Sequence, residues 1–203
     1  VGAGAACAKV ARECARNGLS GAGFLAGVPG TIGGALAMNA GAFGGETWPQ
    51  VAQVETVDRA GQLYTRQPRE YQVAYREVCY PADEGFVACT FSLQPGDVAT
   101  ELDYIRTLLE KRAATQPTGK PSGGSTFRNP AGDYAARLIE ACGLKGCRLG
   151  GAVVAEKHAN FIINDGTANA ADIEQLILHV QAEVQRQQAV SLQVEVKIVG
   201  DEV

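Results

Sequence analysis

The chain has 203 residues, of which 46% are hydrophobic and 20% charged, a composition typical of a folded protein with a buried core rather than of a disordered chain. Its formal net charge is −4, and because no basic cluster is present, nucleic acid and anionic membranes are excluded as expected partners. No apolar run approaches the roughly 20 residues that cross a bilayer. The six cysteines lack a spacing suited to zinc. We therefore expect reduced thiols, no metal and a cytoplasmic protein.

Residues 5–17 predict the first helix, because Val10, Ala11, Cys14 and Ala15 fall on one face. Gly18 is a suitable C-terminal stop for this helix. Roughly a third of residues 18–45 are glycine, which argues against a helix or a central strand. So much glycine instead indicates tight turns, or the approach of something large to the main chain.

Within this stretch, residues 28–34 (VPGTIGG) offer successive main-chain N–H groups with little side-chain cover. Such groups can bind a pyrophosphate or a planar ring that carries carbonyls. The composition fits a purely structural cluster of turns equally well. The stretch has neither the Lys-Ser/Thr ending of a P-loop nor the G-x-G-x-x-G of a Rossmann site.

Residues 51–66 then predict two strands joined by a turn at Asp58–Gly61. A short helical turn is expected to start at Pro68, and residues 85–93 predict a strand rich in aromatic and β-branched side chains. Residues 97–115 predict a helix, since their apolar side chains recur at helical spacing.

Residues 116–130 (QPTGKPSGGSTFRNP) break this periodicity with three prolines and three glycines. The segment carries more polar chemistry than a spacer needs, so we expect a site-forming loop at a domain junction rather than a bare linker. The junction divides the chain into residues 1–115 and 116–203.

The second piece alternates helix and strand. A short helix over residues 133–142 ends at Gly143, a buried strand follows at 158–165, and Asn169 caps a helix over 170–188. Residues 191–199 predict a last strand that turns Leu192, Val194, Val196 and Ile198 inward. The order of elements indicates an α+β fold in two parts.

Three short pieces carry candidate chemistry: Arg76 follows Tyr75, Ser125 lies in GGSTFRNP, and Glu156 lies in AEKHANF. Each has an ordinary structural explanation, respectively a surface cation, a loop serine bonded to its own backbone and a residue beside the structural histidine His158. Together they supply a cation, a hydroxyl and a carboxylate, a set that could stabilise an enolate and deliver a proton.

The motifs GLSGAGFLAGVPGTIGGALAMNAGAFGGE, KPSGGSTFRNP and AEKHANFIIN, in this order and spacing, resemble those of the UDP-N-acetylenolpyruvoylglucosamine reductases. The resemblance covers essentially the whole chain. It implies the second part of an FAD-binding (PCMH-type) α+β domain over residues 1–115, followed by a smaller α+β substrate-binding domain over 116–203. It further implies FAD as cofactor, NADPH as reductant and UDP-N-acetylglucosamine enolpyruvate as substrate, in peptidoglycan precursor synthesis.

By the same resemblance, the catalytic residues are Arg76, Ser125 as proton donor and Glu156, and the substrate-binding residues are Tyr75 and Asn129. Hydride addition β to a carboxylate builds negative charge on that carboxylate, which a nearby arginine stabilises. The residues expected against the flavin are Val28, Pro29, Gly30, Thr31, Gly33, Gly34, Ala35, Asn39 and Gly41.

The sequence also departs from the family pattern. The Gly-Ser-Asn motif of the family's first flavin-binding subdomain has no match, so we expect only part of the flavin site here, and no insertion marks the longer subclass. Ala155 and Ala189 replace a serine and a glycine that are common in the family. Two alternatives therefore stay open: a UDP-sugar-binding remnant without catalysis, and another flavoprotein of the same superfamily, which would have no need of a proton donor such as Ser125.

Overall fold

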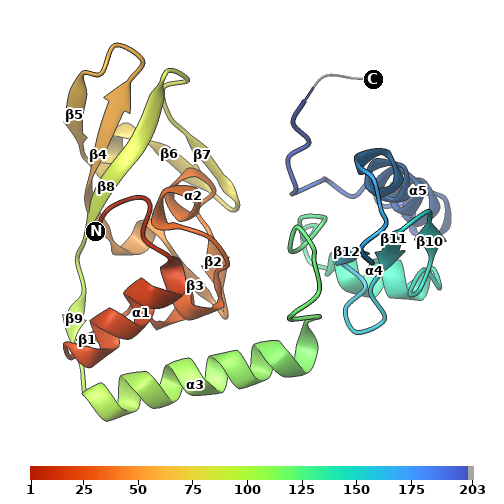
Figure 1. Ribbon diagram of the computed structural model, residues 1–203, viewed down its shortest axis with the longest axis horizontal. Helices are drawn as coiled ribbons and strands as arrows, with labels where there is room; N and C mark the ends of the chain where they lie inside the picture. Colours follow the sequence, from red (N-terminus) through yellow and green to blue (C-terminus); the bar gives the residue numbers. More distant parts are fainter. Residues whose placement is uncertain (201–203) are drawn as a thin grey trace. The chain divides into compact units, whose positions relative to one another are not determined.

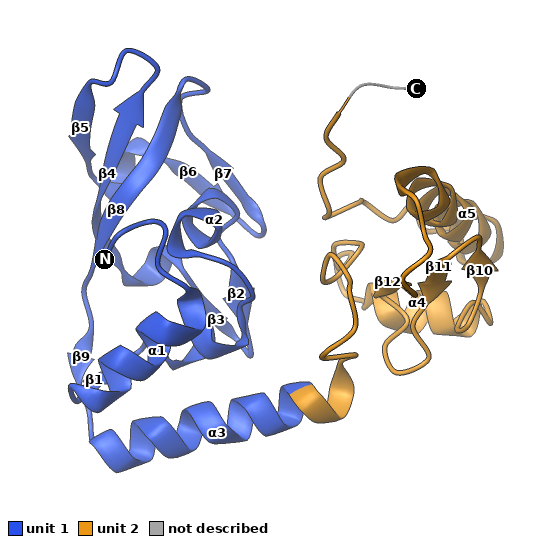
Figure 2. Ribbon diagram, viewed as in Figure 1, with its two compact units in different colours: residues 1–112 blue, residues 113–203 orange. Residues whose placement is uncertain are grey.

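The computed structural model describes residues 1–200 and divides into two compact units, Val1–Arg112 and Ala113–Val203 (Figures 1 and 2). Helix α3 (Val98–Thr115) begins in the first unit, and its last residues belong to the second. Each unit has a hydrophobic core of its own, as expected of separate domains.

The largest sheet of the first unit is antiparallel, with the strand order β5-β4-β8. Its strands are β4 (Val51–Asp58), β5 (Leu63–Arg66) and β8 (Glu84–Phe91). Gly61 donates its N–H to Asp58 O at 3.0 Å and has a φ of +83°, a conformation that glycine adopts without strain. This turn confirms the predicted hairpin, and β8 confirms the strand expected near residues 85–93.

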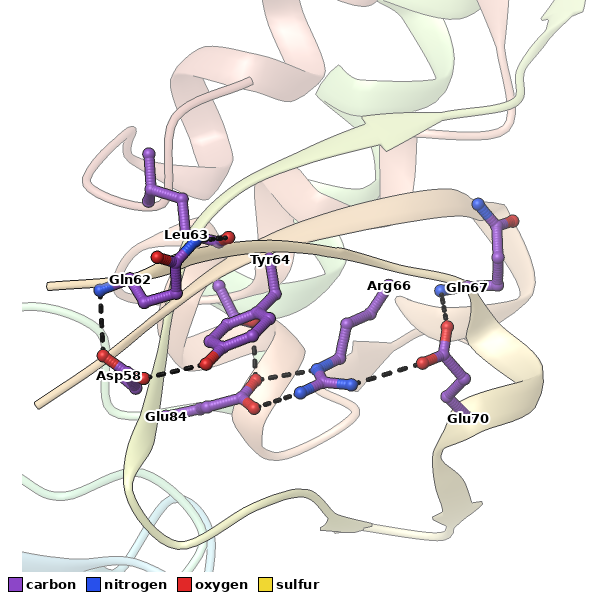
Figure 3. A network of polar contacts seen from close by, with 9 residues as sticks. Asp58, Gln62, Leu63, Tyr64, Arg66, Gln67, Glu70 and Glu84 are labelled. Carbon is purple, nitrogen blue, oxygen red and sulfur yellow. Dashed lines mark hydrogen bonds and ion pairs between the residues drawn. The ribbon is translucent and has the colours of Figure 1, made fainter. Parts of the chain in front are cut away.

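A polar network ties this sheet to the short 3-10 turn η3 (Pro68–Glu70) (Figure 3). The Arg66 guanidinium forms an ion pair with Glu84, to which its Nε donates at 2.8 Å, and the Thr56 hydroxyl donates to the same carboxylate at 2.6 Å. Arg66 also reaches Glu70 at 3.3 Å, and Glu70 caps the start of η3 by accepting from Gln67 N at 2.6 Å. The network therefore fixes the point at which the chain leaves the sheet.

After η3 the chain forms a second hairpin, β6 (Gln72–Ala74) and β7 (Glu77–Cys79), which the sequence did not predict. The expected helical turn at Pro68 is confirmed but lasts only three residues. Tyr75 and Arg76 form the hairpin turn, and Arg76 has a φ of +56°. A non-glycine residue at this turn position gives no local signal, so the hairpin was missed.

Short elements and one regular helix pack beside the sheet. The regular helix, α1 (Cys7–Arg16), confirms the prediction, with Val10, Ala11 and Ala15 buried and Gly18 closing it at a φ of +66°. The short elements are β1 (Leu19–Ser20), which pairs with β9 (Gln94–Pro95), the 3-10 turns η1 (Gly23–Gly27) and η2 (Trp48–Gln50), and the paired strands β2 (Gly41–Ala42) and β3 (Gly45–Glu46).

The prediction that the glycine-rich stretch holds no helix is wrong for α2 (Ile32–Ala37). A Cβ on Gly33 would come within 3.1 Å of the Ala3 Cβ, and Gly33 donates its N–H to Ala3 O at 2.8 Å. A side chain on Gly33 would therefore require this helix or Ala3 to shift slightly. The packing of Ile32 and Leu36, both fully buried, outweighs the low helix propensity of glycine.

In the second unit α5 (Ala170–Gln188) packs on a small antiparallel sheet and against α4 (Ala135–Ala141), which shares the same hydrophobic core. The sheet has the order β10-β11-β12, with β10 (Arg148–Leu149), β11 (Ala152–Val154) and β12 (Ile162–Asn164). Both helices confirm the predictions, and Asn169 caps α5 by accepting from Asp172 N at 2.8 Å. The predicted strand at 158–165 is confirmed only as β12, since the residues before it form a turn in which Phe161 N donates to His158 O.

The predicted last strand over residues 191–199 is wrong in its extent. Val194 forms an isolated bridge with Phe127, and Leu192 is buried, but no strand ladder follows. Ile198 is 61% exposed rather than inward-facing. Alternation of apolar residues indicates a strand only where a neighbouring strand supplies partners, and here pairing stops near Val196.

All six cysteines are free thiols, of which Cys7 and Cys89 are buried. Among residues 1–200, the structure contains no helix with the length and hydropathy that a membrane span requires.

Candidate functional site

The glycine-rich turn at Pro29–Thr31 exposes its backbone on the first unit. Pro29, Gly30 and Thr31 are exposed, whereas Val28 and Ala35 at the two ends of the segment are buried. Gly30 has a φ of +110°, which L side chains rarely adopt, and its carbonyl accepts from Cys7 N at 3.0 Å. The turn is thus held rigidly by α1 while its outer side stays accessible.

The glycines of this stretch serve two different purposes. A Cβ on Gly27 would come within 2.6 Å of the Phe43 ring, and one on Gly45 within 2.6 Å of the Phe24 ring, so these glycines permit close packing. A Cβ on Gly30 would meet no protein atom within 4 Å. Packing explains the first pair, and the open space at Gly30 fits a large group lying on the main chain.

The open turn has space for an FAD group above its glycines, but it has fewer free N–H donors than the sequence predicts. Gly34, like Gly30, has space above it, since a Cβ there would meet only Thr31 Oγ1 at 4.0 Å. However, Ile32 N donates to Ala5 O at 2.9 Å and Gly33 N to Ala3 O. These two N–H groups are therefore used within the protein and do not add to the row of donors expected for a pyrophosphate.

Asn39 lies at the centre of a buried junction. Its side chain is 2% exposed and its φ is +42°. The amide Nδ2 donates to Glu46 Oε2 at 3.0 Å and to Ala74 O at 3.2 Å, and Oδ1 accepts from Trp48 N at 3.1 Å. The Asn39 side chain thus binds protein groups and joins the glycine-rich stretch to the β6–β7 hairpin.

Arg76 returns from that hairpin to the same junction. Its guanidinium donates to Asn39 O at 3.2 Å and to Gly41 O at 2.6 Å, and it lies over the Tyr75 ring with 5.0 Å between Cζ and the ring centroid. The structure therefore brings the Tyr75–Arg76 pair to Asn39 and Gly41, which the sequence singled out in a different motif. Glu46, which completes this junction through Asn39, was missed because the sequence gives a glutamate after two glycines no distinguishing signal.

Ser125 lies in the second unit, at the start of a strongly bonded segment. Ser125 is half-buried, and the next two residues, Thr126 and Phe127, are buried. Thr126 N donates to Asn160 O at 2.8 Å, and Thr126 O accepts from Glu195 N at 2.8 Å. The backbone of Glu195 is therefore hydrogen-bonded one residue from Ser125, a proximity that the sequence did not indicate.

Glu156 and Asn129 have clear local settings in the same unit. Glu156 is exposed, and its carboxylate lies directly against Gly146, where a Cβ would overlap Oε1. Asn129 is exposed. Its Oδ1 accepts from Ala135 N at 3.1 Å, which gives a partner to one of the free N–H groups in the first turn of α4. Burial lowers the pKa of His158 below its ordinary value, so its ring is neutral near pH 7.

The expected site residues thus form two groups. Arg76, Tyr75, Asn39 and Gly41 meet in the first unit, and the open turn at Gly30 belongs to the same unit. Ser125, Asn129 and Glu156 belong to the second unit. Each group is built by its own fold.

Comparison with known proteins assigns both units to families. Residues 1–66 match an FAD binding domain, as the sequence predicts, and residues 116–199 match the C-terminal domain of UDP-N-acetylenolpyruvoylglucosamine reductase. A solved UDP-N-acetylenolpyruvylglucosamine reductase from Thermus caldophilus is 34% identical and covers 97% of this chain and 71% of its own, with a TM-score of 0.86. These matches confirm the α+β fold class.

Relatives of higher identity carry the same name. The UDP-N-acetylenolpyruvoylglucosamine reductase of Alkalilimnicola ehrlichii is 59% identical over 98% of this chain and 67% of its own length. That of Legionella pneumophila (strain Corby) is 57% identical over 99% of this chain and 66% of its own length. The chain therefore spans about two thirds of the length of these relatives, and it belongs to the UDP-N-acetylenolpyruvoylglucosamine reductase family.

Proposed function

We propose that this chain is the part of a flavin-dependent reductase that turns UDP-N-acetylglucosamine enolpyruvate into UDP-N-acetylmuramate, with NADPH as reductant. The observation that carries the proposal is the anchoring of the Arg76 guanidinium on the carbonyls of Asn39 and Gly41, in the unit that matches an FAD binding domain. In this proposal residues 1–115 contribute to the flavin site, and residues 116–203 form the substrate domain.

The residues divide the work as follows. When bound, reduced FAD supplies the hydride that adds to the terminal carbon of the enolpyruvyl double bond. Arg76 stabilises the negative charge that then develops on the adjoining carboxylate. Ser125 gives its hydroxyl proton to the neighbouring carbon, which completes the lactyl ether, and the remaining alkoxide takes up a proton from solvent. Tyr75 and Asn129 bind the substrate.

Serine is a weak acid near neutral pH, so a carboxylate or another polar group must assist its proton transfer. Glu156 is the residue that the family motif suggests for this role. The backbone bond between Glu195 N and Thr126 O brings the main chain of a second acidic residue within one position of Ser125, so Glu195 is the other candidate for this role.

The test uses a full-length protein that contains this chain, and it separates the two half-reactions by rapid mixing. We expect Ser125→Ala and Arg76→Ala to keep flavin reduction by NADPH near the wild-type rate. We expect both to slow flavin reoxidation by substrate by about 10²-fold or more, which is typical for removal of a proton donor or of a charge-stabilising donor. Normal reoxidation in both variants would refute the proposed roles of Ser125 and Arg76, whereas a wild-type protein that binds substrate without reoxidation of its flavin would favour the non-catalytic binding alternative.

The carboxylate is assigned by comparing Glu156→Gln with Glu195→Gln in the same assay. Only the variant at the assisting residue should slow reoxidation strongly while substrate binding is retained.

The proposal includes a cytoplasmic location, which the six free thiols support because disulfides are rare there.

A further inference from the structure

The Asn160 side chain makes an unusual pair of contacts in the second unit. It is buried, with 4% exposed. Its Oδ1 accepts from Phe127 N at 2.9 Å, and its Nδ2 donates to Phe127 O at 2.8 Å. One amide thus satisfies both backbone groups of a single residue, as a neighbouring strand would do.

The main chain on both sides continues this restraint. Asn160 O accepts from Thr126 N at 2.8 Å, so the backbone and the side chain of one residue hold two consecutive residues after Ser125. On the opposite side, Thr126 O accepts from Glu195 N, and Arg128 N donates to Gln193 O, each at 2.8 Å. The segment is therefore fixed from two directions by residues 33 or more positions away.

These bonds hold the residues that directly follow Ser125. Gly124, which precedes it, has a φ of +86° and open space where a Cβ would lie, whereas Phe127 is 1% exposed. The half-buried Ser125 thus lies between the segment that these bonds hold and a glycine turn whose other end is held by the bridge between Ser122 and Ile163. Its position depends on the bonds that hold Thr126 and Phe127.

We propose that Asn160 is a positioning residue that sets the place of the Ser125 hydroxyl through the backbone of residues 126 and 127. This inference rests on the proposed proton-donor role of Ser125. A side chain at position 160 must both donate and accept to keep the two Phe127 bonds. Aspartate keeps the size and the acceptor but lacks the donor, so its second oxygen would face Phe127 O.

The experiment compares Asn160→Asp and Asn160→Ala in the full-length holoenzyme. We expect reoxidation of reduced flavin by substrate to slow by about 10- to 100-fold, since a small misplacement of a reacting group has effects of this size. Flavin reduction by NADPH and the substrate dissociation constant should change by less than about twofold. Asn160→Asp keeps the test usable if Asn160→Ala does not fold.

The matched control is Asn164→Ala. Asn164 is another asparagine whose side chain both donates and accepts, in three bonds to Gly166 and Ala168, but these hold a different turn. Loss of these bonds should lower stability and leave the reoxidation rate within about twofold of the wild type. If Asn164→Ala slows reoxidation as much as Asn160→Asp does, Asn160 has only a structural role and the inference is overturned.

A double variant tests whether Asn160 acts through Ser125. We expect Ser125→Ala with Asn160→Asp to be no slower than Ser125→Ala alone, because the hydroxyl to be positioned is already missing. Additive effects would overturn the inference. Hydrogen exchange at the Thr126 and Phe127 amides should be faster in Asn160→Asp and unchanged in Asn164→Ala.

The two proposals fail in different ways. A slow Ser125→Ala together with a normal Asn160→Asp refutes the positioning role and leaves the proposed function standing. A normal Ser125→Ala refutes the proton-donor role and this inference with it.

Discussion

The junction around Asn39 offers the most direct test of the architecture, by the substitution Asn39→Ala. The change removes two donated bonds, to Glu46 and Ala74, and the acceptor of Trp48 N. Trp48 is 5% exposed, so its backbone N–H cannot form a replacement hydrogen bond with water. Such a buried unsatisfied group costs about 1–3 kcal/mol. Ala74 is exposed and its carbonyl can be rehydrated, so its bond contributes at the low end of the usual range of about 0.5–1.5 kcal/mol.

The backbone adds a further contribution. Asn39 has a φ of +42°, where alanine is less favourable than asparagine by up to about 1 kcal/mol. We therefore expect Asn39→Ala to lower the free energy of unfolding by about 2–5 kcal/mol. Asn39→Gly loses the same hydrogen bonds but tolerates this φ, so its loss should be smaller by up to about 1 kcal/mol.

The measurement is urea unfolding of the full-length protein followed by circular dichroism at fixed protein and flavin concentrations. Asn17→Ala is the matched control, since Asn17 also donates to two groups of Glu13 but is exposed, and it should stay within about 0.5 kcal/mol of the wild type. A loss below about 1 kcal/mol for Asn39→Ala would show that the junction relaxes, and would refute this account of its bonds.

Three further predictions concern other parts of the chain. The Arg66 hydrogen bond holds the pKa of Glu84 below its usual range. The stabilisation from ionised Glu84 is therefore present above about pH 4.3, the ordinary glutamate pKa, and is lost as pH falls through the lowered value. The stability difference between wild type and Glu84→Gln should shrink in acid denaturation, and a difference independent of pH would contradict this. Gly146→Ala should lower the free energy of unfolding by about 1–2 kcal/mol and displace the Glu156 carboxylate, because the φ of Gly146 is +74° and a Cβ there would overlap that carboxylate. An unchanged melting temperature in thermal unfolding would contradict this packing. Ala189→Gly should stabilise the protein by up to about 1 kcal/mol, since Ala189 ends α5 at a φ of +57°, which glycine adopts more easily. A lower melting temperature would show that the greater entropy of glycine in the unfolded chain outweighs this gain.

The sequence by itself determined the features that local rules control. The helices α1, α3, α4 and α5 follow from apolar residues at helical spacing, and the β4–β5 hairpin follows from Asp58 and Gly61 at its turn. The order of three motifs was enough to predict the family and the FAD binding domain, which the comparisons confirm. These properties depend on neighbouring residues or on fixed spacing, both of which are visible in the sequence.

Local signals failed where pairing decides the structure. The alternation over residues 191–199 predicted a full strand, but the segment finds a partner only around Phe127. The glycines of α2 argued against a helix, and burial of Ile32 and Leu36 overrode them. In both cases the energy of packing and pairing exceeds the local preference, so the local preference misleads.

The site contacts depend on tertiary structure alone. Arg76 reaches Asn39 O across 37 positions, and Asn160 reaches Phe127 across 33. Local propensity does not distinguish Asn39 or Asn160 from an exposed asparagine such as Asn17, although both are buried and both donate and accept through their side-chain amides. Amino-acid type tells which bonds an asparagine can make, and only the fold decides which groups are close enough to make them.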